Sequence, residues 1–324
     1  MNLTRFVLVT AFCLTTTLTH AAGFSFIEVP ADKDGPALRG AVWSPCNAPA
    51  GRIALDPLVI DGTKDCPVDG TGLPLIVMSH GTGGSFLSHH DTAAALADAG
   101  FVVAAISHPG DNFQDLSRQD HLSAFATRPV DLRRLTDYML AVWSGHSKLD
   151  AGQVGVFGHS RGGYTGLVAI GAVPNFKLRE DLCPPASTIP ACEKISRNEL
   201  PPAPVLDPRI KAAVIVDPLS FFDAAALKNV TVPVQLWASE YGGDGVTLES
   251  VEAVRRDLPS PPGWHMAANA AHFAFIAPCT PAMTRIAPQI CTDRDGFDRA
   301  AFHKTFNSDV VGFFRRDVMQ AATP

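Results

Sequence analysis

The chain has 324 residues, of which 46% are hydrophobic, so it is long and apolar enough for one large α/β domain with a sizeable core. Its formal net charge is −6, and no block of basic residues occurs, which argues against nucleic acid as a partner.

The N-terminus has the pattern of a secretory signal peptide. Arg5 precedes an apolar stretch at 6–18, and small residues follow it. We expect residues 1–22 to be removed, by cleavage after Ala21 or Ala22, leaving a periplasmic or secreted protein. The apolar stretch is too short to span a bilayer comfortably, so no stable membrane anchor is expected. A retained N-terminal anchor is the alternative.

Short apolar segments alternate with helical patterns along the rest of the chain. This alternation predicts the α/β class, with a mostly parallel central sheet of about eight strands and helices on both faces. Strands are predicted at 24–29, 40–43, 75–79, 102–107, 154–157, 210–216, 234–237 and 265–268. Helices are predicted at 92–99, 130–143, 163–173, 251–258 and 302–314.

Two segments interrupt this alternation. Residues 48–73 hold Gly, Pro and Asp and are predicted to be a surface excursion. Residues 174–208 are rich in proline and lie where an α/β enzyme often carries a lid or a cap over its pocket, although an ordinary loop is the alternative. No linker divides the chain, so residues 23–324 are predicted to form a single domain with a cap insertion.

Six cysteines remain beyond the signal peptide, in three pairs that are close in sequence. We predict the disulfides Cys46–Cys66, Cys183–Cys192 and Cys279–Cys291, which suit an oxidising compartment. Metal binding is disfavoured, because there is no C-x-x-C spacing and no partnering group of histidines. No metal and no other cofactor is expected.

Residues 154–164 read Val-Gly-Val-Phe-Gly-His-Ser-Arg-Gly-Gly-Tyr. An apolar strand thus leads into G-x-S-x-G, and a helical pattern follows at once, which is the context of a nucleophile elbow. Ser160 is the predicted nucleophile at the apex of this tight turn, which glycines permit. An ordinary glycine-rich turn is the alternative interpretation.

A serine hydroxyl needs a base within hydrogen-bond reach and a third group that orients the base. Where a nucleophile elbow is used, the chain order is serine, acid, histidine. His272 follows the last predicted strand and is the predicted base. His265 lies inside that strand and His303 inside a predicted helix, so both fit less well.

Two aspartates are candidates for the acid. Asp217 closes the apolar strand at 210–216 and would be costly to bury without a partner. Asp244, like Glu240, lies in the loop after the strand at 234–237, although two glycines move it away from the strand end. Asp217 is preferred, and Asp244 stays open.

The oxyanion of the reaction needs two backbone donors. One is expected to be the N–H of Arg161, directly after the nucleophile. The other is expected from Thr82, with Gly81 as the alternative, in the glycine-rich loop after the strand at 75–79. That loop lacks the residues of a phosphate-binding motif.

Several histidines invite a functional interpretation. His80 is expected to brace the glycine-rich loop, and His159 and Gly81 to line the site and contact substrate. His108 with Asp111 resembles a pair of metal ligands, as does the adjacent pair at 89–90, but loop histidines are more often hydrogen-bonded locally.

Three motifs together carry a resemblance: residues 77–84, Val-Met-Ser-His-Gly-Thr-Gly-Gly; residues 158–163, Gly-His-Ser-Arg-Gly-Gly; and residues 270–273, Ala-Ala-His-Phe. They resemble the α/β-hydrolase superfamily, and within it the bacterial predicted dienelactone hydrolases and the platelet-activating-factor acetylhydrolases. The second group implies an acid at the position of Asp217 and has a Ser-Glu-Tyr like that at 239–241. The first implies an acid nearer Asp244. Dienelactone hydrolases use a cysteine nucleophile, whereas this chain has Ser160, so a serine esterase is the better description.

The predicted function is that of an exported serine hydrolase that cleaves short-chain carboxylic esters or lactones through an acyl-enzyme. Its partner would be a small-molecule ester. A lipase or polyester hydrolase is one alternative, and an amidase or peptidase is another. A catalytically silent binding protein on the same fold is the alternative from a different class.

Overall fold

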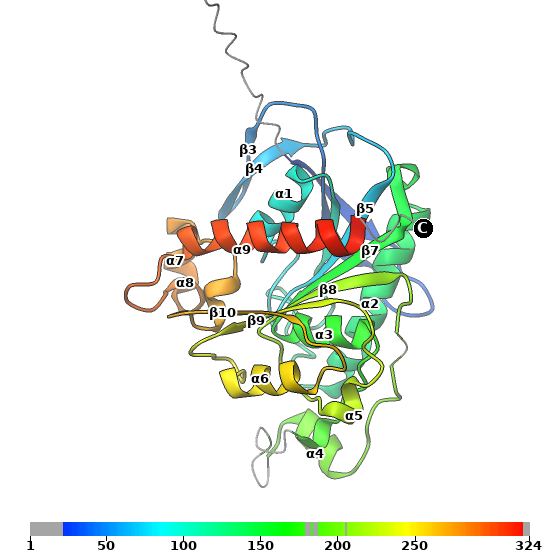
Figure 1. The fold of residues 1–324 in the computed structure, drawn as a ribbon, viewed down its shortest axis with the longest axis vertical. Helices are drawn as coiled ribbons and strands as arrows, with labels where there is room; N and C mark the ends of the chain where they lie inside the picture. Colours follow the sequence, from blue (N-terminus) through cyan, green and yellow to red (C-terminus); the bar gives the residue numbers. More distant parts are fainter. Residues whose placement is uncertain (1–21, 179–182, 184–186, 205, 320–324) are drawn as a thin grey trace, which may run out of the picture.

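The computed structural model describes residues 22–178, 183, 187–204 and 206–319. Apart from Ala22, the predicted signal peptide lies outside the described residues. Ten strands in this part of the chain form a sheet in the order β10-β9-β8-β7-β5-β6-β2-β1-β4-β3. Figure 1 shows the sheet with helices packed around it. The strands are β1 Gly23–Val29, β2 Leu38–Ser44, β3 Gly51–Leu55, β4 Leu58–Lys64, β5 Leu73–Ser79, β6 Val102–Ile106, β7 Leu149–His159, β8 Ile210–Val216, β9 Val234–Ser239 and β10 Gly263–Ala267. The helices are α1 His90–Asp98, α2 Leu122–Ala141, α3 Arg161–Ala169, α4 Pro190–Ser196, α5 Ala224–Leu227, α6 Leu248–Asp257, α7 Pro281–Ile286, α8 Pro288–Cys291 and α9 Arg299–Phe314.

The centre of the sheet is parallel. Strands β6, β5, β7, β8, β9 and β10 pair with their neighbours in parallel register. On the other side of β6, strand β2 pairs antiparallel with both β6 and β1, and the β3–β4 hairpin completes the edge. Because the ends of parallel strands meet at one edge, the loops after β5, β7, β8 and β9 converge there.

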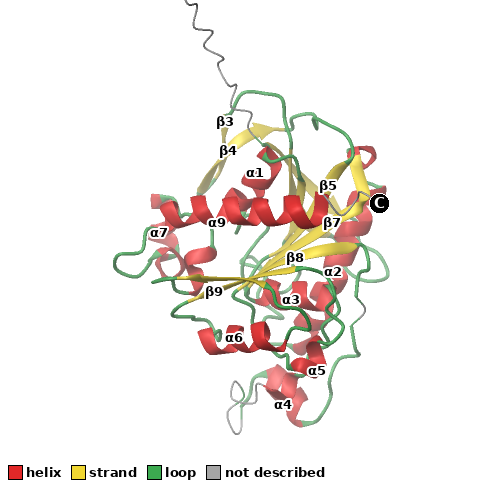
Figure 2. Ribbon diagram, viewed as in Figure 1, coloured by secondary structure: helices red, strands yellow, loops and turns green. Residues whose placement is uncertain are grey.

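Helices cover both faces of the sheet (Figure 2). On one face α1 and α9 pack on the strands through buried residues such as Leu96 and Phe314. On the other face α2, α3 and α6 do so, through residues such as Leu132, Leu167 and Val254. Between the two layers, β5, β6, β8 and β9 are buried almost throughout, and β7 is buried from Val154 to His159. These stretches are covered on both faces, which is why they are mostly apolar. The fold is that of an α/β hydrolase, as predicted.

Each of the eight predicted strands overlaps an observed strand, but β3 and β4 were missed. They lie in the segment that the sequence predicts to be a surface excursion. Only Ile53 of β3 and two residues of β4 are buried, so the hairpin lacks the continuous apolar run of a central strand. Helix α2 also begins at Leu122 rather than at residue 130 and contains Pro129.

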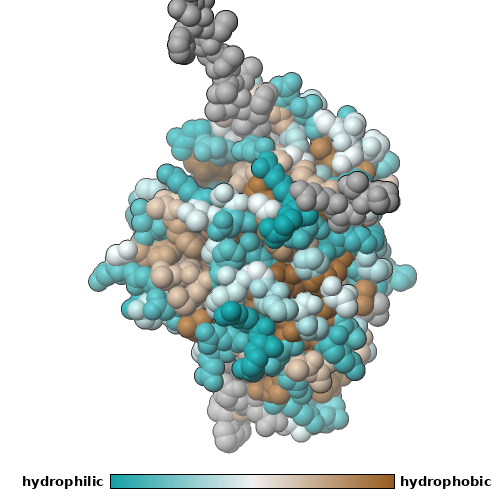
Figure 3. Space-filling view, in the orientation of Figure 1, coloured by the Kyte–Doolittle hydropathy of each residue, from teal (hydrophilic) through white to brown (hydrophobic). Residues whose placement is uncertain are grey.

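The three predicted disulfides are present, Cys46–Cys66, Cys183–Cys192 and Cys279–Cys291. Such bonds fit an oxidising compartment. Within the described part of the chain, no helix has both the length and the apolarity needed to cross a bilayer. Polar side chains cover most of the face in Figure 3, broken by smaller apolar patches.

Candidate active site

Ser160 stands at the turn between β7 and α3. Its φ of 58° and ψ of −121° lie in a region that side chains rarely adopt, and its N–H donates to the carbonyl oxygen of Val216 over 2.9 Å. The glycines around it are required by close backbone contact. A Cβ on Gly158 would overlap the carbonyl of Gly162, and a Cβ on Gly162 would overlap the carbonyl of Ser79.

His272 and Asp217 meet at the same edge of the sheet. Asp217 follows β8 directly, and His272 begins a 3-10 turn, His272–Phe275, after β10. Nδ1 of His272 lies 2.7 Å from Oδ2 of Asp217, and both residues are buried. A carboxylate accepts, so Nδ1 carries the proton and Nε2 is left as the basic nitrogen.

The carboxylate of Asp217 has two further donors, both from Ser239 at the end of β9. The Ser239 N–H donates to Oδ1 over 2.8 Å, and the Ser239 hydroxyl donates to Oδ2 over 2.6 Å. A buried carboxylate is therefore fully supplied with hydrogen bonds. This role of Ser239 was not predicted, although a serine at the end of the strand next to a buried aspartate is a signal for it.

Ser160 and His272 line one small cavity of about 20 Å³. Its lining residues are Gly81, Thr82, Gly84, Ser88, His159, Ser160, Asp244, His272, Phe273 and Ile276. Nε2 of His272 is buried and has no hydrogen-bond partner among the described residues. No hydrogen bond joins it to Ser160 in this part of the chain. Such bonds often form only once substrate is bound.

Asp244 and Glu240, the other acids considered, do not contact His272 through a hydrogen bond or ion pair in the described structure. Asp244 is exposed at the rim of the cavity, in a turn closed by two hydrogen bonds between Gly243 and Val246. Glu240 accepts a hydrogen bond from the N–H of Asn269. The structure thus brings Asp217, and not Asp244, to the imidazole.

The predicted oxyanion donors flank the serine. Arg161 is the first residue of α3, whose opening N–H groups have no partner within the helix. Gly81 and Thr82 line the cavity opposite, and an added Cβ on Gly81 would stand 3.1 Å from the Ser160 Cβ. Among the described residues, neither the N–H of Thr82 nor that of Arg161 donates a hydrogen bond. Both donors are therefore available to a ligand.

His159 and His80 are buried beside these groups. The His159 ring stacks on that of His272 with 4.7 Å between centroids, and its Nε2 donates to the His272 carbonyl over 3.2 Å. His80 accepts the N–H of His108 at Nε2 and donates from Nδ1 to the Gly81 carbonyl over 2.6 Å. Burial holds the pKa of both rings well below the ordinary value, so both are neutral.

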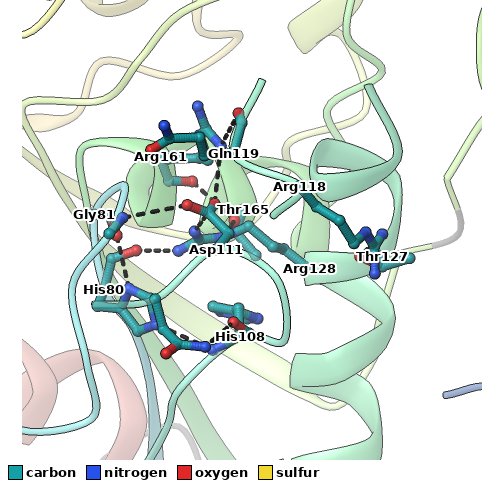
Figure 4. Close-up of polar contacts among 12 residues, drawn as sticks. His80, Gly81, His108, Asp111, Arg118, Gln119, Thr127, Arg128, Arg161 and Thr165 are labelled. Carbon is teal, nitrogen blue, oxygen red and sulfur yellow. Dashed lines mark hydrogen bonds and ion pairs between the residues drawn. The ribbon is translucent and has the colours of Figure 1, made fainter. Parts of the chain in front are cut away.

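A polar network that the sequence analysis did not predict lies beneath the glycine-rich loop (Figure 4). Arg128 of α2 pairs with Asp111 over 2.6 Å and also donates to the backbone carbonyl of His80. The side chain of Arg161 pairs with the same oxygen of Asp111 over 2.9 Å. The other Asp111 oxygen accepts the N–H of Gly83 over 3.2 Å. All these side chains are buried.

Both ring nitrogens of His108 contact side chains other than that of Asp111. Its Nδ1 lies 3.0 Å from Asp131, and its Nε2 lies 2.9 Å from the Ser79 hydroxyl. His89 hydrogen-bonds the backbone carbonyl of Phe275. No group of three or more His, Cys, Asp or Glu side chains among the described residues is arranged to hold a metal ion.

The described part of the predicted cap contributes nothing to the lining of the cavity at Ser160. Instead Pro174, Phe176 and 200–204 line a separate cavity of about 320 Å³ against α2. The role of this segment as a cap stays a prediction. The cavity at Ser160 is bordered by Phe273 and Ile276, close to the disulfide-linked α7–α8 segment.

Fold and site together define a class: an α/β-hydrolase fold with a serine at the strand-to-helix turn and a histidine–aspartate pair beside it. A ferulic acid esterase from Streptomyces cinnamoneus is a solved structure to which the chain is similar. The two superpose with a TM-score of 0.65 at 19% sequence identity, over 96% of this chain and 93% of that chain. At this identity the likeness shows the fold alone. At the level of sequence, no family profile and no curated protein matches the chain. The narrower resemblance to dienelactone hydrolases and platelet-activating-factor acetylhydrolases stays a prediction.

Proposed function

We propose that this protein is an exported serine hydrolase that cleaves carboxylic esters through Ser160, His272 and Asp217. The observation that carries the proposal is the 2.7 Å contact between His272 Nδ1 and Asp217, which leaves a buried, unpartnered Nε2 in the cavity that Ser160 lines. An imidazole held in this tautomer is the base that a serine hydroxyl needs.

The reaction proceeds in two halves. His272 takes the proton of Ser160 as the hydroxyl oxygen attacks the ester carbonyl. The N–H groups of Arg161 and Thr82 bind the oxyanion that forms. The tetrahedral intermediate expels the alcohol, which takes its proton from His272. Water then attacks the acyl-enzyme, again giving its proton to His272, and releases the carboxylic acid and free Ser160.

The size of the cavity favours small acyl groups. The cavity beside Ser160 is small, about 20 Å³, so a long or branched acyl group would need the lining residues to move. An acetyl or similarly short acyl group is therefore the proposed substrate portion. The esterase with a similar fold is described as acting on ferulic acid esters, so methyl ferulate belongs in the test panel beside short-chain esters and lactones.

A second candidate function is the hydrolysis of apolar or polymeric esters, and one observation favours it. Phe113 is 64% exposed and Leu116 45% exposed, and both border the glycine-rich loop. The N–H of Phe113 donates to the Gly84 carbonyl, and Leu116 is 3.2 Å from the Cβ position of Gly83. Exposed apolar side chains at the edge of a site are typical of a surface that holds an apolar ligand.

Replacing Ser160 tests the proposal. Ser160→Ala is expected to abolish turnover of p-nitrophenyl acetate and labelling by a fluorophosphonate probe while the melting temperature is retained. Ser88→Ala is the matched control, because Ser88 lines the same cavity but is not proposed to react. Unchanged turnover by Ser160→Ala, or equal loss in the control, would refute the assignment. A silent binding protein would not be labelled at all.

A further inference from the structure

Asp111 stands between the two segments from which the oxyanion donors come. Its Oδ1 accepts the N–H of Gly83, the residue after Thr82, over 3.2 Å. Its Oδ2 lies 2.9 Å from the side chain of Arg161. One carboxylate thus joins the glycine-rich loop after β5 to the first residue of α3.

This carboxylate has little freedom to move. The side chains of Asp111 and Arg128 are each 1% exposed, and that of Arg161 is 9% exposed. Burial pulls the pKa of Asp111 upward, but the charges of Arg128 and Arg161 outweigh it, so the carboxyl has a pKa below its ordinary value and is ionised. Arg128 keeps its charge as well, because burial lowers its pKa only to about 10.

The Arg161 side chain is held at three points. Besides Asp111, its Nη1 donates to the carbonyl of Gln119 over 2.8 Å, and its guanidinium lies 4.5 Å above the ring of Phe125. A turn of the Arg161 backbone would have to be taken up by the torsions of its side chain or would break these contacts. The direction of its N–H is therefore coupled to the position of Asp111.

The glycine-rich loop is held from below by the same network. Arg128 donates to the backbone carbonyl of His80 and to the Ser79 hydroxyl, and the Ser79 hydroxyl donates to His108. His108 in turn donates to Asp131 over 3.0 Å. Ser79, His108 and Asp131 repeat the residue types of a catalytic triad. Unlike Ser160 and His272, they line neither of the two cavities described above, so they are not placed to meet a substrate.

We propose that Asp111 is a positioning residue that sets the separation of the two oxyanion donors by holding Gly83 and the Arg161 side chain on one carboxylate. This inference rests on the proposed function. Oxyanion donors act at about 2.7–3.1 Å from the charge, so a shift of well under 1 Å weakens their hydrogen bonds to the transition state. Binding of the ester substrate is affected less, because its carbonyl oxygen carries little charge. Asp111 itself does not touch the substrate.

Two variants test this role. Asp111→Asn removes the charge of the carboxylate. Arg161→Met removes the side-chain contact with Asp111 and keeps the backbone N–H that would bind the oxyanion. If Asp111→Asn does not fold, Arg161→Met alone tests the role of Asp111. We expect kcat on p-nitrophenyl acetate to fall by about tenfold or more, and KM to change by less than about threefold. The inhibition constant of a trifluoromethyl ketone, which forms an oxyanion with Ser160, should rise by the factor by which kcat falls. Arg161→Lys should recover part of the loss.

Arg299→Met is the matched control for a purely structural effect. Like Arg161, Arg299 is buried, with a side chain 6% exposed, and it contacts one carboxylate, Asp293, and one backbone carbonyl, Ile290. It should lower the melting temperature while kcat stays within about twofold of the parent. The role of Asp111 is overturned if folded Arg161→Met keeps the parent kcat and inhibitor affinity, or if Arg299→Met loses as much kcat. A parent protein that hydrolyses no ester would instead refute the proposed function, and with it this role.

Discussion

Asp217 and Ser239 are joined by two hydrogen bonds, from the N–H and the hydroxyl of the serine to the two carboxylate oxygens. They lie at the ends of the neighbouring strands β8 and β9. The hydroxyl and His272 Nδ1 share the same oxygen, Oδ2. This arrangement fixes the plane of the carboxylate toward the imidazole.

Asp217→Asn and Asp244→Asn are expected to differ sharply. The first variant can hold His272 in the wrong tautomer, so we expect kcat on p-nitrophenyl acetate to fall by about 10²–10⁴. The second alters an exposed side chain at the rim, so kcat should stay within about threefold. Steady-state kinetics of the two variants, measured side by side, show which aspartate is the acid. A larger loss in Asp244→Asn would move the role of acid to Asp244.

Ser239→Ala removes the hydroxyl contact and leaves the N–H contact. The carboxylate of Asp217 then loses one of its buried hydrogen bonds, and we expect kcat to fall by about tenfold with KM nearly unchanged. Ser239→Thr restores a hydroxyl and should recover most of the rate. Equal kinetics for the alanine variant and the parent would show that the N–H contact is sufficient.

The exposed side chains beside the glycine-rich loop are expected to affect apolar substrates selectively. Phe113→Ser combined with Leu116→Ser should lower hydrolysis of emulsified tributyrin by about fivefold or more, since apolar contact area is lost. Turnover of p-nitrophenyl acetate should stay within about twofold. Val142→Ser is the control, because Val142 is 63% exposed but follows the end of α2. A loss of the same size on both substrates would contradict an apolar docking role.

Buried histidines are expected to make the fold sensitive to acid. Burial lowers the pKa of His89 from 6.5 to about 4, so its contribution to stability is present above pH 6.5 and is lost as the pH falls toward 4. At pH 5 this loss is about 2 kcal/mol for His89 alone. His80, His90, His108 and His159 shift in the same direction, also chiefly through burial.

Urea unfolding at pH 7.5 and pH 5 measures this effect. The free energy of unfolding should fall on acidification in the parent, and by about 2 kcal/mol less in His89→Asn. Asparagine can still donate to the Phe275 carbonyl, so the variant replaces the titrating group without removing its hydrogen bond. The same pH dependence in both proteins would show that His89 titrates normally in the folded state.

Much of the architecture could be predicted from local pattern. The apolar strands at the centre of the sheet are continuous runs because both of their faces are covered, and all of them were found. The β3–β4 hairpin was missed because only its Ile53 and Ile60 and one glycine are buried. The aspartate and proline at 56–57 also predict a loop. An edge hairpin needs little apolar surface, so its sequence carries little signal.

The network beneath the glycine-rich loop could not be predicted in the same way. Asp111, Arg128, Asp131 and Arg134 are charged residues that no local sequence pattern marks as buried. Arg134 is in fact buried and pairs with Asp32 over 2.9 Å. Charges of this kind are buried only when partners from other segments surround them, and those partners are up to 104 residues away in the chain.

The sequence by itself determined that apolar strands alternate with helices around a mostly parallel sheet, that a serine flanked by glycines follows one of these strands, and that a histidine follows the last one. Each of these features depends on residues that are neighbours in the chain. Only the tertiary structure decided which aspartate meets His272 and how the loop after β5 is tied to the start of α3. Those contacts depend on the relative positions of strand ends and loops to within an ångström or so. Packing of the whole sheet and its two helical layers sets these positions, and no short stretch of sequence encodes them.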